Sequence, residues 1–375
     1  MLSCRDFYQL LEGKEISFYS GVPDSLLKDF CAYVTDNTVH EKNIITANEG
    51  NAIAMAAGYH LATGKIGVVY MQNSGLGNCV NPLTSLTDPE VYSIPLLLLI
   101  GWRGEPGTYD EPQHKKMGRI MPNLVKSMEI PYSILPSDLK NAKQCLDEAV
   151  EYMKKNNAPY AILIKKDTFD SYKLQKKDAA RFPLNREQAL KLVVPLLGQK
   201  DIVVSTTGKI SRELFELRNG SQQGLEKDFL TVGCMGHASS IALGIALQKP
   251  ARNVYCFDGD GAAIMHMGAL STIGNLKPAN LKHVIFNNFA HDSVGGQSTA
   301  AETVYFPAMA LANGYKATFS AETEEEIKYF MEKIKIFPGL VLLEIRCNRG
   351  ARENLGRPTT APIENKKEFM SFAGE

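Results

Sequence analysis

The chain has no surplus of charge: 41 basic and 41 acidic side chains give 375 residues a formal net charge of zero. A protein that binds nucleic acid needs excess cations to displace the counterions of phosphate groups. A polybasic membrane anchor needs them at the lipid surface. The longest apolar run, residues 94–102, is also far shorter than the roughly 20 residues of a spanning helix. The sequence therefore predicts neither a nucleic-acid partner nor a membrane partner.

The seven cysteines form no Cys-x-x-Cys pair, and their number is odd. This pattern is typical of free thiols in a reducing compartment rather than of a disulfide framework. The first residues, MLSCRDFYQLLEGKE, carry acidic side chains too early for a secretory signal. We therefore expect a cytoplasmic protein.

Short apolar, β-branched runs alternate with amphipathic helical stretches in both halves of the chain. Strands that are apolar along their whole length, separated by helices, indicate parallel βαβ sheets. The sequence predicts an α/β protein with two Rossmann-like parallel-sheet domains, residues 1–167 and 191–375, and a charged linker, 168–190. The linker is too short for a third, central domain. The expected strands are residues 43–47, 66–71, 95–101, 132–135, 160–164, 201–205, 253–257, 283–287 and 340–345.

Several common nucleotide and hydrolase motifs are incomplete. The Gly75-Leu76-Gly77 run follows a strand but lacks the third glycine of a dinucleotide fingerprint. Gly64-Lys65 has Ile66 where a phosphate loop needs Ser or Thr. The chain also contains neither His-Glu-x-x-His nor Gly-x-Ser-x-Gly, so most nicotinamide, NTPase and hydrolase functions are excluded.

One motif pair predicts a site for a metal and a diphosphate. Asp260 lies between Gly259 and Gly261 directly after a buried strand, and Asn288 ends the next strand. Parallel strands end at the same sheet edge, so the two side chains should lie together. Their oxygens suit Mg²⁺. A helix beginning near Ala262 would turn its free amides toward an anion.

This pairing resembles the diphosphate-binding motif of the thiamine diphosphate enzymes. The resemblance implies that Asp260, Asn288 and the carbonyl of Ala290 ligate Mg²⁺, beside cofactor contacts from Gly259, Gly261 and Ala262. It also implies that Met235 lies under the bent cofactor and that the carbonyl of Gly233 accepts from its 4′-amino group. Plain core packing is the alternative role for Met235.

Glu49 follows a strand and begins an Ala-rich helix, which is where the pyrimidine-binding domain of this family carries its glutamate. The resemblance implies a catalytic carboxyl group that hydrogen-bonds the pyrimidine ring, and this role needs a dry site that raises its pKa. A negative charge that merely favours the helix dipole is the alternative.

The resemblance also implies residues for proton transfer in the first half. Ser25 matches best in the loop after the first strand, and Asp24 is adjacent. His114 lies in a second loop, where related decarboxylases keep a histidine. His291 and Asp292, just beyond the metal loop, are weaker alternatives.

The absence of a central domain resembles the compact decarboxylases of phosphonopyruvate and sulfopyruvate. The likeness extends over residues 19–27, 72–78, 110–118, 233–244 and 355–358. It implies conversion of 3-phosphonopyruvate to phosphonoacetaldehyde and CO₂, a step toward 2-aminoethylphosphonate. Sulfopyruvate decarboxylation, another small 2-oxo-acid decarboxylase or carboligase activity, and a non-catalytic nucleotide-binding protein remain alternatives.

A 2-oxo acid with an anionic tail needs cations in its pocket, and arginine matches phosphonate better than lysine. For any one basic residue, solvated surface charge is the alternative. In this family the pyrimidine half of one subunit faces the diphosphate half of another, which implies a homo-oligomer, at least a dimer. The candidate cations are Arg103, Lys115, Lys116, Arg119, Arg349, Arg352 and Arg357.

Overall fold

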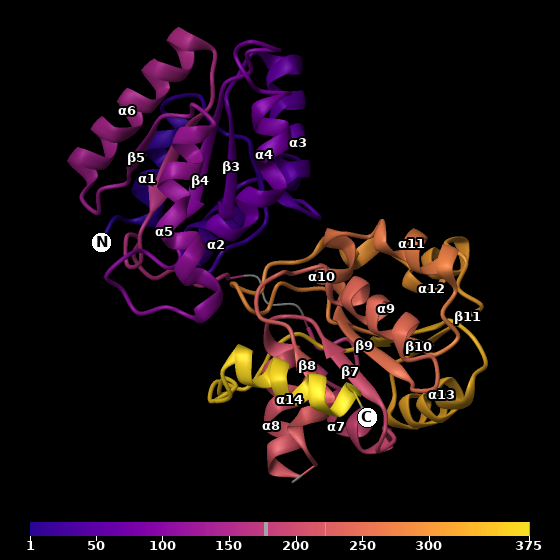
Figure 1. The fold of residues 1–375 in the computed structure, drawn as a ribbon. Coiled ribbons are helices and arrows are strands. Elements are labelled where there is room, and N and C mark those ends of the chain that lie inside the picture. Colours follow the sequence, from indigo (N-terminus) through magenta and orange to yellow (C-terminus); the bar gives the residue numbers. More distant parts are fainter. Residues whose placement is uncertain (176–178, 222, 375) are drawn as a thin grey trace. The chain divides into compact units, whose positions relative to one another are not determined.

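The computed structural model describes residues 1–175, 179–221 and 223–374. The chain divides into two compact units, Met1–Lys177 and Asp178–Glu375 (Figure 1). No helix in the described residues is long and apolar enough to cross a membrane.

The first unit is built on a six-stranded sheet in the order β2-β1-β3-β4-β6-β5, with every pairing parallel. Its strands are β1 Tyr19–Gly21, β2 Asn43–Ile45, β3 Gly67–Gln72, β4 Leu96–Gly101, β5 Tyr132–Ile134 and β6 Tyr160–Ile164. Its helices are α1 Cys4–Glu12, α2 Lys28–Asn37, α3 Glu49–Thr63, α4 Leu76–Thr84, α5 Pro112–Ser127 and α6 Leu139–Asn156, with 3-10 turns η1 His40–Lys42 and η2 Asn73–Gly75.

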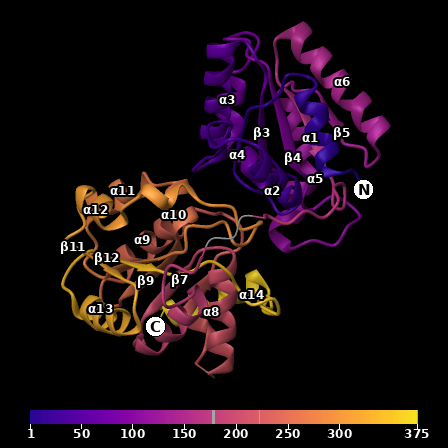
Figure 2. The same ribbon diagram turned by 180° about the vertical axis from the view of Figure 1, so that it is seen from behind.

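Helices cover both faces of this sheet (Figure 2). Along the central strand β4, Leu97 and Leu99 pack against α1, α2 and α6, whereas Leu98 and Ile100 pack against α3, α4 and α5. Successive strand residues point to opposite faces, so a strand buried on both faces is apolar throughout.

The second unit repeats this plan with the parallel order β11-β12-β10-β9-β7-β8. Helices α9 to α12 lie on one face of its sheet, and α7, α8 and α13 lie on the other (Figure 1). Its strands are β7 Ile202–Ser205, β8 Asp228–Leu230, β9 Val254–Gly259, β10 Leu281–Asn287, β11 Ala317–Ala321 and β12 Val341–Arg346. Its helices are α7 Arg186–Val193, α8 Lys209–Gly220, α9 Ala238–Gln248, α10 Asp260–Met265, α11 Ala269–Leu276, α12 Phe306–Ala312, α13 Glu324–Ile336 and α14 Pro362–Gly374, with turns η3 Val194–Leu196, η4 Leu225–Lys227 and η5 Ala300–Thr303.

The prediction of two parallel α/β sheets is confirmed. Strands β1, β8 and β11 are not among the expected strands. β1 is only three residues long. β8 and β11 pair with a neighbour along only one edge, and β11 is only half-buried. Short edge strands carry a weaker apolar signal than central ones.

The range predicted as a linker, residues 168–190, is partly structured. Phe169 packs in the core of the first unit, and the Oδ1 atom of Asp170 accepts the amide of Cys4 at 2.9 Å. Helix α7 begins at Arg186 because Asn185 and Gln188 form a capping box at its start. Residues 176–178 of the predicted linker lie outside the described residues.

Candidate active site

Asp260 is the first residue of α10, directly after β9, and it is buried. Burial raises the pKa of Asp260 to about 6, against hydrogen bonds that favour the charged form, including a 2.5 Å bond from the Thr299 hydroxyl. Within the described residues, no Lys or Arg forms an ion pair with this carboxylate. A buried carboxylate without a cationic partner suits a metal ion.

Asn288 and Ala290 reach the same sheet edge from β10, which pairs with β9 in parallel. Both residues are buried. The Asn288 side chain donates a 2.6 Å hydrogen bond to Asp292, and its Oδ1 atom accepts the amide of Ala290 at 3.3 Å. The three predicted metal ligands thus belong to adjacent strand ends, and their donor atoms are all oxygens.

His291 and Asp292, the two weaker candidates for proton transfer, make contacts typical of a structural role. Arg186 donates to Asp292 at 2.9 Å and makes two bonds of 2.8 Å to Glu213. Burial lowers the pKa of His291 to about 4, so its imidazole is uncharged near neutral pH. Asp292 therefore holds the loop through an ion pair, and His291 is part of the packed interior.

The predicted cofactor loop before α9 has a left-handed backbone at Gly233 and Cys234, with φ values of 73° and 54°. The amide of Gly233 donates to the Thr207 hydroxyl at 3.1 Å, and Met235 is partly exposed. Thr207 follows β7, so this strand end supplies a third loop at the same edge. This loop was not predicted from the sequence, although the chain there has a strand, then the residues Thr-Thr-Gly, and then a helix.

Gly261, directly after Asp260, leaves little room for a side chain. A Cβ atom on Gly261 would lie 3.2 Å from both His291 and Thr299. At the start of α10, a side chain at Gly261 would therefore press on both residues. Ala262 is buried in the same turn.

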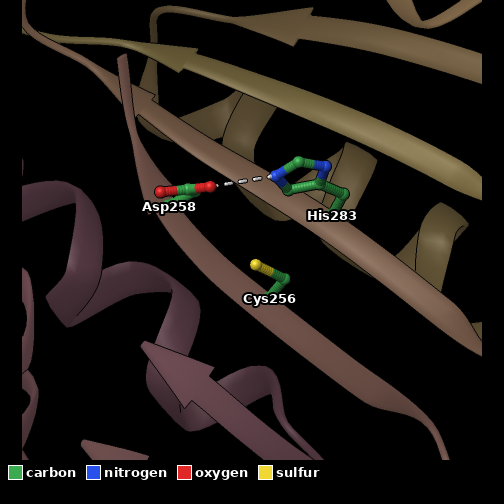
Figure 3. A group of neighbouring side chains, drawn as sticks. All are labelled: Cys256, Asp258 and His283. Carbon is green, nitrogen blue, oxygen red and sulfur yellow. Dashed lines mark ion pairs between the residues drawn. The ribbon is translucent and has the colours of Figure 1, made fainter. Parts of the chain in front are cut away.

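A second polar group lies behind this edge, on β9 and β10 (Figure 3). Parallel register places His283 opposite Cys256, and its Nε2 atom lies 3.6 Å from Oδ2 of Asp258. One donor atom from each residue lies within 4.8 Å of the others, so the group could in geometry hold a metal ion. Burial raises the pKa of the Cys256 thiol well above its usual value, and a protonated thiol is a poor ligand. Asp258 instead accepts the Gly259 amide at 3.0 Å, which holds the turn before Asp260.

In the first unit, Glu49 begins α3, with Asn48 as its N-cap. It is buried, and burial raises the pKa of its carboxyl group. Asn78 on α4 works against this shift through a 2.7 Å hydrogen bond to Oε2. A Cβ atom on Gly75 would lie 2.4 Å from Oε1, so that glycine makes room for the carboxyl group.

Asp24 and Ser25 follow β1 but differ in exposure. Asp24 is fully buried, and burial raises its pKa although Gln72 donates to it at 2.7 Å. A Cβ atom on Gly101 would lie 1.8 Å from its Oδ2 atom. Ser25 is half-buried and accepts a 2.7 Å hydrogen bond from Arg103.

The predicted basic residues and His114 differ in their exposure and in their ion pairs. His114 is buried on α5, whereas Lys115, Lys116 and Arg119 are exposed on the same helix. Arg103 pairs with Asp110 at 2.5 Å.

In the second unit, Arg352 pairs with Glu187 and with Glu216, and Arg357 is exposed. Arg349 borders a cavity of about 170 Å³ that Asn288 also lines. Arg349 therefore shares a cavity with one of the predicted metal ligands.

Comparison with known proteins agrees with this fold. Residues 4–122 match the family described as thiamine pyrophosphate enzyme, N-terminal TPP binding domain, and residues 216–345 match the corresponding C-terminal TPP binding domain. The chain is thus a member of the thiamine pyrophosphate enzymes.

Its relatives define a narrower family. Phosphonopyruvate decarboxylase of Streptomyces hygroscopicus is 35% identical, with 100% of this chain and 95% of the relative covered. Its counterpart in Streptomyces viridochromogenes is 34% identical, with 99% and 95% covered. Sulfopyruvate decarboxylase of Methanosarcina acetivorans is 26% identical, with 96% and 95% covered. The chain belongs to the family of the phosphonopyruvate decarboxylases, and the predicted membership in the thiamine diphosphate-dependent decarboxylases is confirmed.

Proposed function

We propose that this chain decarboxylates 3-phosphonopyruvate to phosphonoacetaldehyde and CO₂, with thiamine diphosphate and Mg²⁺ as cofactors, in phosphonate biosynthesis. The observation that carries the proposal is the full-length similarity to two phosphonopyruvate decarboxylases. It is supported by the buried carboxyl groups of Glu49 and Asp260 at the carboxyl edges of the two sheets.

The side chains of Asp260 and Asn288 and the carbonyl of Ala290 would hold the Mg²⁺ ion. The fit rests on the buried Asp260 carboxylate, which lacks a cationic partner among the described residues. A divalent ion would replace the proton that burial favours on this carboxylate. The adjacent turn of Gly259, Gly261 and Ala262 would accept the diphosphate, because its amides begin a helix.

In the loop before α9, the carbonyl of Gly233 would accept from the cofactor's amino group, and Met235 would support its bent shape. Bound thiamine diphosphate supplies a nucleophilic carbon and an electron sink for the loss of CO₂. Burial raises the pKa of Glu49 and so favours its protonated form, and Asn78 fixes the orientation of the carboxyl group. Glu49 of the first unit would thus serve the pyrimidine ring, and the second unit would hold the diphosphate and contact the amino group through Gly233.

Proton transfer at the substrate is assigned to the first unit. Ser25 is the better-placed donor because it is half-buried, whereas the adjacent Asp24 is fully buried and accepts hydrogen bonds from Leu26 and Gln72. His114 is a second candidate on α5. A phosphonate tail would be bound by at least one cation among Lys115, Lys116, Arg119, Arg349 and Arg357.

We further propose a homo-oligomer, at least a dimer. Helix α3 packs one face on the sheet and leaves an apolar stripe exposed on the other, formed by Ala54, Met55, Gly58, Leu61 and Ala62. Exposed apolar stripes of this kind mark contact surfaces. Glu49 begins the same helix, so a dimer contact along α3 would bring the partner chain to the cofactor site.

The test offers phosphonopyruvate, sulfopyruvate and pyruvate in parallel to the purified protein with thiamine diphosphate and Mg²⁺, and measures CO₂ and product. The proposal requires the highest kcat/KM for phosphonopyruvate, with phosphonoacetaldehyde as product. A preference for sulfopyruvate would assign the sulfonate activity instead, and a condensed product would indicate a carboligase. Absence of CO₂ release from all three acids would refute the proposal.

A further inference from the structure

Asp110 fixes the side chain of Arg103. Its carboxylate accepts hydrogen bonds from Nε and Nη2 of Arg103 at 2.8 and 2.5 Å, and from the amides of Gly104 and Glu111 at 2.7 and 2.8 Å. Burial alone would raise the pKa of Asp110, but these donors hold it well below its usual range. A bidentate carboxylate fixes the plane of a guanidinium as well as its position.

The remaining terminal nitrogen of Arg103 acts on Ser25. Its Nη1 atom donates to the Ser25 hydroxyl oxygen at 2.7 Å, across 78 residues of sequence. A hydroxyl oxygen that accepts from Arg103 keeps its own proton to donate. The acceptor recorded for that proton is Oδ1 of Asp24, a long contact of 3.4 Å, and Oδ1 already accepts from Gln72 at 2.7 Å. The hydroxyl can therefore turn to a substrate group at little cost.

We propose that Arg103 and Asp110 are positioning residues, and that this pair fixes the Ser25 hydroxyl as a hydrogen-bond donor toward the substrate. The inference rests on the proposed function, in which Ser25 contacts the substrate. It assigns a role to Asp110, and it removes Arg103 from the cations that bind the anionic tail. The Arg103 charge is compensated by Asp110 at 2.5 Å, and its side chain is only 17% exposed.

The first test separates kcat from KM. Arg103→Ala and the isosteric Asp110→Asn are assayed with the 2-oxo acid that the wild type consumes fastest. We expect kcat to fall by about 100-fold for Arg103→Ala, the scale of a misplaced reacting group, with KM within about 3-fold of the wild type. Lys143→Gln, which breaks the exposed ion pair with Asp147 in the same unit, is the matched control and leaves both constants unchanged.

The second test asks whether Arg103 acts through Ser25. Added guanidinium ion should restore part of the kcat of Arg103→Ala, because it can refill the space between Asp110 and Ser25. The same addition should have no effect on the double variant Ser25→Ala/Arg103→Ala. That double variant should be no slower than Ser25→Ala alone, since residues that act as a unit are not additive.

A rise in KM with unchanged kcat in Arg103→Ala would overturn the inference, because it would mark Arg103 as a binding group for the substrate tail. Additive losses in the double variant would overturn it as well. Hydrogen exchange supplies a readout without turnover: Asp110→Ala, which removes both oxygens, should lose protection at the Gly104 amide, and retained protection would refute the fixed pair. If the wild type consumes no 2-oxo acid, the proposed function fails, and this exchange measurement alone decides about the pair.

Discussion

Asn78 donates a 2.7 Å hydrogen bond to the carboxyl group of Glu49, and the two residues belong to neighbouring helices, α4 and α3. The contact fixes one oxygen of a buried acid whose pKa is raised by burial. The other oxygen faces Gly75. Asn78 thus fixes the orientation of the Glu49 carboxyl group, while burial favours the protonated form of that group.

Replacement of Glu49 by Gln should lower kcat by about 100-fold or more, the range of a lost acid–base group. Gln keeps the size and the contact with Asn78 but cannot exchange a proton. Binding of thiamine diphosphate, measured by calorimetry, should be retained. The exposed Glu41→Gln is the control. A fully active Glu49→Gln variant would contradict the assigned role.

Gly75→Ala should lower kcat by about 10-fold or more, because the new Cβ atom would lie 2.4 Å from the Glu49 carboxyl group and must displace it. Its backbone is helical, with φ of −75°, so the backbone tolerates alanine. Gly77→Ala on α4 meets no atom within 4 Å and should leave kcat unchanged while stabilising the helix by up to about 1 kcal/mol. Equal activities of the two variants would show that the space beside Glu49 is not needed.

Removal of Mg²⁺ with a chelator should abolish CO₂ release, and added Mg²⁺ should restore it. Asp260→Asn should weaken Mg²⁺ binding by about 100-fold or more, since even residues behind a ligand contribute 10–100-fold. Titration calorimetry in the presence of thiamine diphosphate measures this change. Glu325→Gln on the exposed face of α13 should bind normally. Normal binding by Asp260→Asn would place the metal elsewhere.

Lys282 should make stability rise with pH in the alkaline range. Burial lowers its pKa to about 8, while in the unfolded chain it stays near its ordinary value of 10.5. Between these values the unfolded state binds more protons, so the free energy of unfolding increases with pH.

Comparison with Lys282→Met isolates this effect from other titrating groups. From a pH of about 7.5 to about 10, the wild type should gain roughly 2 kcal/mol relative to the variant, at about 1.4 kcal/mol per pKa unit. Chemical denaturation at both pH values measures it, with the exposed Lys328→Met as control. A pH-independent difference would mean that Lys282 is charged in the folded protein.

Leu61→Glu should dissociate the proposed dimer, because it places a charge in the exposed apolar stripe of α3, where Leu61 is 71% exposed. Sedimentation velocity should show a smaller species and a parallel loss of activity. Ile336→Glu, at an exposed position of the second unit, serves as the control. An unchanged sedimentation coefficient would exclude α3 from the contact.

The amino-acid pattern by itself determined the two parallel sheets and the strand ends that carry Glu49, Asp260 and Asn288. These follow from local information, since apolar runs that alternate with helices can form only sheets covered on both faces. Parallel strands then bring their carboxyl ends to one edge. Membership of the thiamine diphosphate enzymes was accessible because its motifs lie at these strand ends.

Only the tertiary structure decided how individual side chains pair. Arg103 looked like a free cation in the sequence, but the fold compensates it with Asp110 and directs it to Ser25. Cys256 and His283 became neighbours through strand register. Such pairings depend on register, burial and loop paths between distant segments, and residue spacing along a chain does not encode these directly.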